Sequence, residues 1–163
     1  MDRPTIVPTL FYKDPIAALK FLEQAFGFET TSLVVDAEGR LGHSEVDCLG
    51  GVISVGSEFA GSIIGSAQMT SPAALGGAGT QFLRINMASG IDEHCERARA
   101  AGARITQEPE NQFYGARVYR ALDPEGHVWN FSQEVATPSV AEMEQATGLK
   151  FHDSIADADA GVG

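Results

Sequence analysis

The stretch from residue 5 to residue 28, TIVPTLFYKDPIAALKFLEQAFGF, predicts a strand that leads directly into a helix. Its first residues are rich in β-branched and aromatic side chains, which favour a strand. Asp14 and Pro15 then stand where a helix N-cap and a first-turn proline are expected. Apolar residues recur at three- and four-residue spacing up to Phe26, and Gly27 follows at the position typical of a helix C-cap. The helix therefore has one apolar face to bury.

The rest of the chain repeats this unit. Strands are predicted after the helix at residues 28–35, 41–49 and 52–56, and the order recurs as a strand at 80–87, a helix at 91–101 and strands at 104–107, 116–122 and 127–134. Aligning Ile16 with Ile91 also aligns Gly27 with Gly102, which indicates an internal duplication. We expect an α+β fold of two βαβββ modules that pack together, because each sheet has a helix on one face only.

The predicted modules occupy residues 1–56 and 80–135. A Gly/Ser/Ala-rich connector, which could form a lid, joins them over residues 57–79. Residues 136–163 form a C-terminal extension that we expect to be partly disordered, because its composition turns to Pro, Ser, Ala and Asp.

Composition and charge exclude several classes of partner. The 163 residues include 11 Lys and Arg against 22 Asp and Glu, a formal net charge of −11 that repels nucleic acid and anionic lipid alike. The chain shows no secretory leader and no apolar run near the roughly 20 residues that a bilayer requires, so we expect a cytoplasmic protein. Cys48 and Cys95 have no metal or redox spacing and are predicted to be buried, unpaired residues.

Several motifs in this order resemble the vicinal oxygen chelate superfamily, the fold of glyoxalases, bleomycin-resistance proteins and dioxygenases. They are YKDP at 12–15, AFGF at 25–28 and DPEGHVW at 123–129. GHSEV at 42–46 and FYGAR at 113–117 are most similar to its PhnB-like branch, which usually has an acidic residue where Ala116 stands. The resemblance covers residues 6–133 and implies curved mixed sheets that enclose a ligand cup, and a homodimer.

The resemblance also implies where a metal would bind, because metal-dependent relatives take His, Glu or Gln ligands from the two opening strands and the closing strand. Alternation directs Phe82, Arg84 and Asn86 into the cup, and it places Asn130 where glyoxalase-like and fosfomycin-resistance members have a carboxylate. Neither opening strand contains His, Asp or Glu, and Gln81 is the one borderline ligand. Because a divalent ion needs charged or imidazole ligands, we expect no metal cofactor.

Other residues are candidates for ligand binding or catalysis. His43 and Glu45 share one face of the third strand and form a tentative acid–base pair, although that face could equally meet solvent or a partner subunit. We expect ligand contacts from aromatic, cationic and amide side chains, namely Phe11, Phe82, Arg84, Asn86, Tyr114, Arg117, Tyr119 and Asn130. Three further residues have other readings. A solvated helix face accounts for His94, a solvated strand face is favoured more for Arg120 than for Arg117, and His127 is assigned to a hairpin cap or the edge of the core.

Two main hypotheses of function follow. The first is a metal-free protein that binds a small drug or metabolite, with resistance by sequestration as one outcome. The second is a glyoxalase-like lyase, isomerase or dioxygenase that uses a divalent metal held by residues such as His43, Glu45 and Gln81, or acid–base chemistry by His43 and Glu45 alone. An accessory subunit without a ligand is a third reading. The missing metal ligands favour the first hypothesis.

Overall fold

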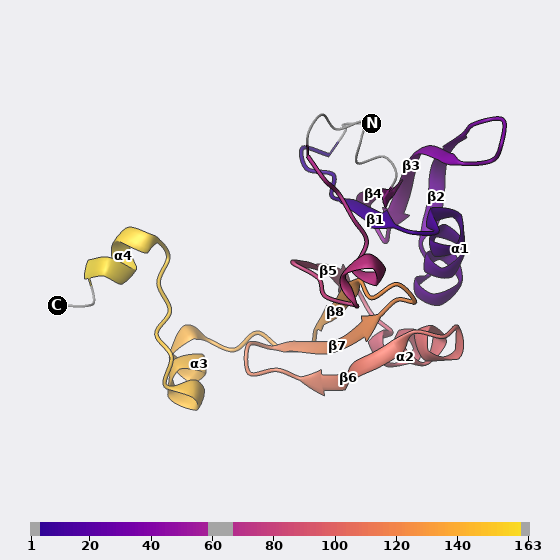
Figure 1. Ribbon diagram of the computed structural model, residues 1–163. Coiled ribbons are helices and arrows are strands. Elements are labelled where there is room, and N and C mark those ends of the chain that lie inside the picture. The colour runs from indigo at the N-terminus through magenta and orange to yellow at the C-terminus, as the bar shows by residue number, and fades with distance from the viewer. Residues whose placement is uncertain (1–3, 59–66, 161–163) are drawn as a thin grey trace.

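The computed structural model describes residues 4–58 and 67–160, and it contains two modules with the same topology (Figure 1). The first module comprises β1 (Thr9–Tyr12), α1 (Pro15–Phe26), β2 (Glu29–Val35), β3 (Leu41–Cys48) and β4 (Gly51–Ser57). The second comprises β5 (Phe82–Met87), α2 (Ile91–Ala100), β6 (Arg104–Asn111), β7 (Ala116–Leu122) and β8 (Val128–Glu134). The strand orders are β1-β4-β3-β2 and β5-β8-β7-β6, and each opening strand lies parallel to the closing strand of its own module. The predicted pair of βαβββ modules is confirmed.

In the described part of the chain, three short helices lie outside the modules. They are η2 (Pro72–Leu75) between the modules, followed after β8 by α3 (Val140–Thr147) and α4 (Ile155–Ala160). Figure 1 shows α3 and α4 leading away from the second sheet. Among the described residues, no helix is both long enough and apolar enough to cross a membrane.

The opening helix forms for the reasons that its sequence indicates. The Asp14 carboxylate accepts a hydrogen bond from the backbone N–H of Ala17, and Gly27 ends the helix with a φ of 69°, a conformation that glycine adopts without strain.

The length of β6 differs from the prediction. This strand runs on to Asn111, whereas the predicted strand ends at Gln107. β6 is the edge strand of its sheet, so Pro109 can lie within it without removing a hydrogen bond from the sheet.

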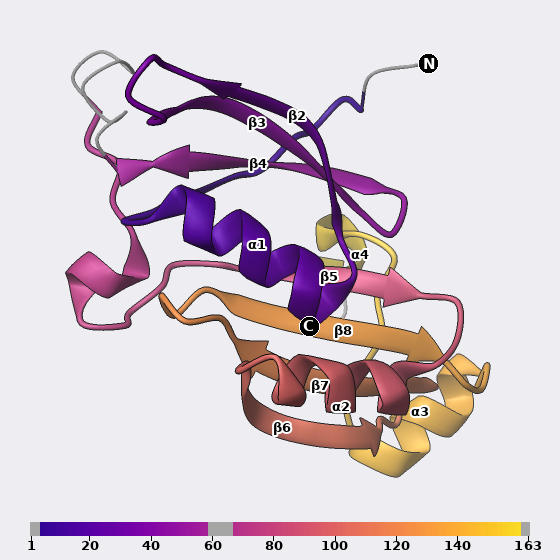
Figure 2. The same ribbon diagram turned by 90° about the vertical axis from the view of Figure 1, so that its right-hand side faces the viewer.

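The two modules share one hydrophobic core. Figure 2 shows β2, β3 and β4 above α1, and the strands of the second module below it. The ring of Phe26, at the end of α1, lies 5.3 Å from that of Trp129 and 4.9 Å from that of Phe131, both on β8 of the other module. All three side chains are fully buried. The modules are therefore joined through apolar contacts that belong to neither module alone.

A buried carboxylate forms the main polar link between the modules. Asp123, in the β7–β8 turn, is 5% exposed, and its Oδ2 accepts hydrogen bonds from the Tyr12 hydroxyl (2.6 Å) and the Trp129 indole (3.1 Å). Its Oδ1 accepts from the backbone N–H groups of Glu125, Gly126 and His127. Burial, together with the Asp123 charge, raises the pKa of Tyr12, so its hydroxyl stays protonated and donates. The turn of one module thereby holds the end of β1 in the other.

The same turn makes two more contacts with the first module. The Glu125 carboxylate accepts from the backbone N–H groups of Lys13 and Asp14, at 2.7 and 2.8 Å. His127 Nε2 lies 2.8 Å from the carbonyl oxygen of Phe11, to which it must donate because a carbonyl only accepts. His127 thus lies at the edge of the core, as predicted, and the DPEGH motif carries much of the link between the modules.

His94 was predicted to face solvent, and this prediction is wrong. The ring is half-buried between the modules, with Nε2 donating to the carbonyl oxygen of Phe26 (2.9 Å) and Nδ1 accepting from the Tyr119 hydroxyl (2.6 Å). Its acidic neighbours on α2 suggest a solvated face, but α1 packs over this residue. Burial lowers the pKa of His94, because charging the ring would place an ion in a poorly solvated position.

The lowered pKa predicts a specific dependence of stability on pH. Between the folded pKa of His94 and its ordinary value of 6.5, the unfolded chain binds more protons than the folded protein. The contribution of His94 to the stability of the fold is therefore complete above about pH 6.5 and decreases as the pH falls through this window. We expect urea denaturation midpoints between pH 7 and 5 to fall further for the wild type than for His94→Gln, whose amide can still donate to Phe26. Identical pH slopes for both proteins would refute the assignment.

Candidate functional site

We call the sheet of β1–β4 sheet 1 and the sheet of β5–β8 sheet 2. Each sheet has one face covered by its helix and one turned away from it, which we call the open face. On sheet 2 the helix-side row of β5 contacts the core through Leu83, Ile85 and Met87, as predicted. The alternate residues of β5 and their register partners on β8 and β7 therefore form the open face. Two of its rows are apolar or neutral on these three strands: Phe82, Val128 and Leu122, which Arg104 of β6 continues, and then Asn86, Ser132 and Val118.

Between these two rows, β5, β8 and β7 contribute three polar side chains, and Gln107 on β6 is opposite the third of them. Arg84 on β5 is opposite Asn130 on β8, which in turn is opposite Arg120 on β7. Asn130 is 5% exposed, and its Oδ1 accepts a hydrogen bond of 3.1 Å from Arg120 Nε. Within residues 4–58 and 67–160, neither guanidinium group has a carboxylate within 4.0 Å. The row thus presents two uncompensated cations beside one buried carboxamide.

On β7, the arginine that lies on the open face is Arg120 and not Arg117, which the sequence predicts as a ligand contact. Arg117 and Tyr119 do share a face, but it is the helix-side face. Tyr119 is fully buried and donates to His94, while Arg117 forms a salt bridge of 2.6 Å with Asp92 at the start of α2. Arg120, for which a solvated strand face was favoured more than for Arg117, is exposed on the open face. The sequence holds a weak signal for this, because Arg120 alternates with the apolar residues Val118 and Leu122.

The predicted acid–base pair lies on the open face of sheet 1. His43 Nε2 is 3.8 Å from Glu45 Oε1, and both side chains are about half exposed, at 54% and 50%. Their register partners on β2 are Val34 and Ser32. The separation allows an electrostatic contact, but it exceeds the length of a hydrogen bond. These groups are accessible, and within residues 4–58 and 67–160 no other side chain forms a hydrogen bond or ion pair with their side chains.

Three further predicted contact residues lie in different settings. Asn86 is exposed at the open face of sheet 2, whereas Phe11 is 6% exposed and its ring lies over Gly56 on the neighbouring strand β4. Tyr114 is in the β6–β7 turn, where it forms an edge-to-face pair with Phe113 at 5.2 Å. Of the predicted ligand contacts, the structure therefore brings Phe82, Arg84, Asn86 and Asn130 together on one face.

At the strand positions where metal-dependent relatives are expected to hold their ion, this chain has poor ligands for a divalent metal. The open-face row of β1 consists of Thr9 and Phe11, after Val7, and the positions on β5 and β8 carry Arg84 and Asn130. The guanidinium cation of Arg84 would repel a metal cation bound here. The carboxamide of Asn130 supplies no charge to offset dehydration of the ion. These residues do not fit the metal centre that the fold implies.

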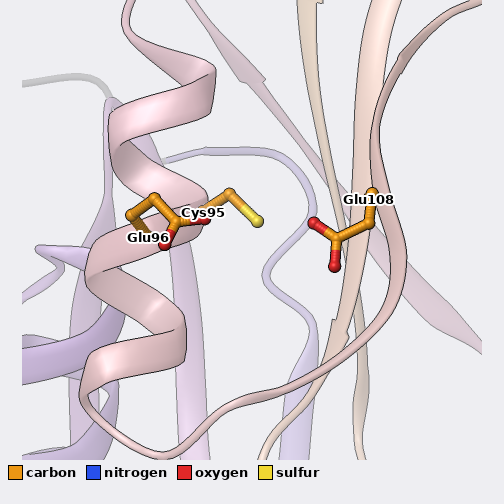
Figure 3. A group of neighbouring side chains, drawn as sticks. All are labelled: Cys95, Glu96 and Glu108. Atoms are coloured by element: carbon orange, nitrogen blue, oxygen red, sulfur yellow. The ribbon is translucent and has the colours of Figure 1, made fainter.

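Another group of possible metal ligands lies on the helix side. Figure 3 shows Cys95 and Glu96 on α2 facing Glu108 on β6, with their ligand atoms within 4.8 Å of one another. Both carboxylates are already paired with Arg99, at 3.5 and 2.6 Å. Burial raises the pKa of the Cys95 thiol to about 11, so the free thiol is protonated at neutral pH. This group is explained by an ion-pair network.

A cleft of about 490 Å³ lies between η2 and the β7–β8 turn. Its lining comprises small residues such as Gly76 and Gly77, the charged residues Arg104 and Glu125, and Asp123. The Asp123 carboxylate already accepts five hydrogen bonds, so it is not available as a catalytic group. The chemistry of the molecule is concentrated on the open faces instead.

Paired βαβββ modules with these strand orders define a protein of the vicinal oxygen chelate class. The chain belongs to the Glyoxalase/Bleomycin resistance protein/Dioxygenase superfamily, whose family model matches residues 5–131. It is 30% identical to TioX from Micromonospora sp. ML1, with a TM-score of 0.59, over 82% of this chain and 100% of that one.

Two other relatives extend the comparison. The uncharacterized protein Rv0887c of Mycobacterium tuberculosis is 28% identical over 143 residues, which span 88% of this chain and 82% of that protein. The fosfomycin resistance protein FosX from Listeria monocytogenes, complexed with Mn(II) and sulfate, is 18% identical with a TM-score of 0.57 and aligns over 90% of this chain and 98% of its own. At that identity the likeness to FosX concerns the fold alone.

Proposed function

We propose that the protein binds a small organic molecule on the open face of sheet 2 and does so without a divalent metal. The observation that carries this proposal is the identity of the residues at the family's metal positions, where Arg84 and Asn130 replace ligands that could neutralise a cation. An exposed aromatic ring, Phe82, lies in the next row and offers a surface for a planar ligand. Recognition would then depend on stacking and hydrogen bonds.

A fluorescence titration with the neutral planar probe N-phenyl-1-naphthylamine tests this proposal. We expect binding that is unchanged by EDTA or by added Mn(II) or Zn(II), and that weakens about five-fold in Phe82→Ala, since one stacking surface is lost. Phe113→Ala is the matched control, because that ring is also exposed but lies in the β6–β7 turn. Loss of binding in EDTA would contradict the metal-free mode, and equal loss in both variants would contradict the assigned face.

A second candidate function is proton transfer by His43 and Glu45, which lie 3.8 Å apart on the open face of sheet 1. It would make the protein a lyase or isomerase of the same fold. We rank it second because both side chains are half exposed and no third group fixes their orientation. Membership of the PhnB-like branch and a homodimer stay predictions from the sequence.

A further inference from the structure

We propose that the ligand carries an anionic group, such as a carboxylate, sulfonate or phosphate, and that Arg84 and Arg120 hold this group above Asn130. The inference rests on the proposed function and specifies the class of molecule that is bound. Its basis is the polar row of β5, β8 and β7, which places two guanidinium groups on either side of one buried carboxamide.

The arrangement of strands sets the span of this row. Neighbouring strands lie about 4.8 Å apart, so the backbones that carry Arg84 and Arg120 are separated by roughly 10 Å with Asn130 between them. Guanidinium groups on flexible stems can reach inward over that span and donate in pairs to one anionic group. Arg120 is already oriented, because its Nε donates to Asn130 Oδ1 and leaves its terminal N–H groups available.

The distribution of arginine partners singles out this face. Among the described residues, Arg40, Arg99 and Arg117 form salt bridges, and Arg97 donates to two backbone carbonyls at the end of α1. The remaining arginines have neither a carboxylate nor a backbone carbonyl as partner, and all lie on the open face of sheet 2 by register: Arg84, Arg104 and Arg120.

This grouping is unexpected in a chain of net charge −11, because 22 acidic residues are available as partners. The carboxylates assigned to the same face are Glu110, opposite Val118, and Glu134, opposite Ala116. Both lie in other rows than Arg84 and Arg120. An uncompensated pair of cations on an acidic protein favours an external anion.

The row beside the arginines indicates the rest of the ligand. It contains Phe82, which is 57% exposed, together with Val128 and Leu122, and it ends at Arg104 on the edge strand β6. A molecule with an anionic end and a flat apolar body would contact both rows at once, with the anion over Asn130 and the body over Phe82. The ligand class is therefore a small amphipathic anion.

A matched pair of fluorescent probes tests the inference. 8-Anilinonaphthalene-1-sulfonate differs from N-phenyl-1-naphthylamine by its sulfonate, so the ratio of the two dissociation constants measures the contribution of the anion. We expect the wild type to bind the sulfonate probe about ten-fold more tightly, and Arg84→Gln/Arg120→Gln to abolish this preference while binding the neutral probe as before. The control Lys20→Gln/Arg40→Gln removes the same charge from α1 and the β2–β3 turn and is expected to keep the preference.

Each other outcome is decisive. Equal binding of both probes to the wild type would overturn the anionic ligand while leaving the proposed small-molecule function in place. If both double variants lost the preference for the sulfonate probe equally, the preference would be a general effect of net charge. That result would also overturn the anionic ligand. Binding of neither probe would refute both the inference and the proposed function. Circular dichroism checks that the double variant is folded, and the single variants Arg84→Gln and Arg120→Gln decide the question if it is not.

Discussion

Asp123→Asn is expected to lower the free energy of unfolding by about 3 kcal/mol, because the amide cannot replace the carboxylate in its buried network. Oδ2 accepts hydrogen bonds from Tyr12 and Trp129, so an amide N–H₂ at that position would face two donors. If the side chain turned over, the N–H₂ group would face three backbone N–H groups at Oδ1 instead. Urea denaturation at neutral pH measures the change.

Asp36→Asn is the matched control for this prediction. Asp36 also accepts hydrogen bonds from backbone N–H groups within its own turn, those of Glu38 and Arg40, but the turn is exposed. We expect a loss below about 1 kcal/mol there, since water can replace the lost partner. A loss at Asp123 no larger than the loss at Asp36 would contradict the role of Asp123 as the polar link between the modules.

Much of the fold could be predicted from the sequence because the deciding signals are local. The N-cap at Asp14, the C-cap at Gly27 and the apolar spacing between them depend on residues within one helix. The alternation on β5 and β8 is equally clear, since one row of each strand is apolar and buried. The duplication then supplied the topology of the second module from that of the first.

The row of β7 that faces the helix could not be predicted in this way, because both alternating rows of this strand mix polar and apolar residues. One row is Arg117, Tyr119 and Ala121, and the other is Val118, Arg120 and Leu122. The helix-side row is decided by partners distant in the chain: Asp92 pairs with Arg117, and His94 accepts from Tyr119. A polar side chain can be buried when such a partner exists, and the local pattern does not reveal it.

The same reasoning explains the error at His94. Asp92, Glu93 and Glu96 surround it in sequence and indicate a solvated helix face. In the structure the end of α1 covers this part of α2, with the Phe26 carbonyl as the acceptor. The packing of one module on the other therefore determined which polar residues are buried. Among the described residues, Arg84 and Arg120 have no carboxylate partner.

Phe26→Ala is expected to cost about 4 kcal/mol, because it removes a fully buried ring at the contact between the modules. The ring packs on Trp129 and Phe131 of the second module as well as on Phe28 of the first. A cavity there weakens both modules together, so we expect one cooperative urea transition at a lower midpoint. Phe21→Ala is the control: its ring is only half-buried and meets Phe26 edge-on, and a loss of about half that size is expected. Trp129 fluorescence and circular dichroism should give the same midpoint in the Phe26 variant, whereas two separate transitions would show that the modules do not share one core.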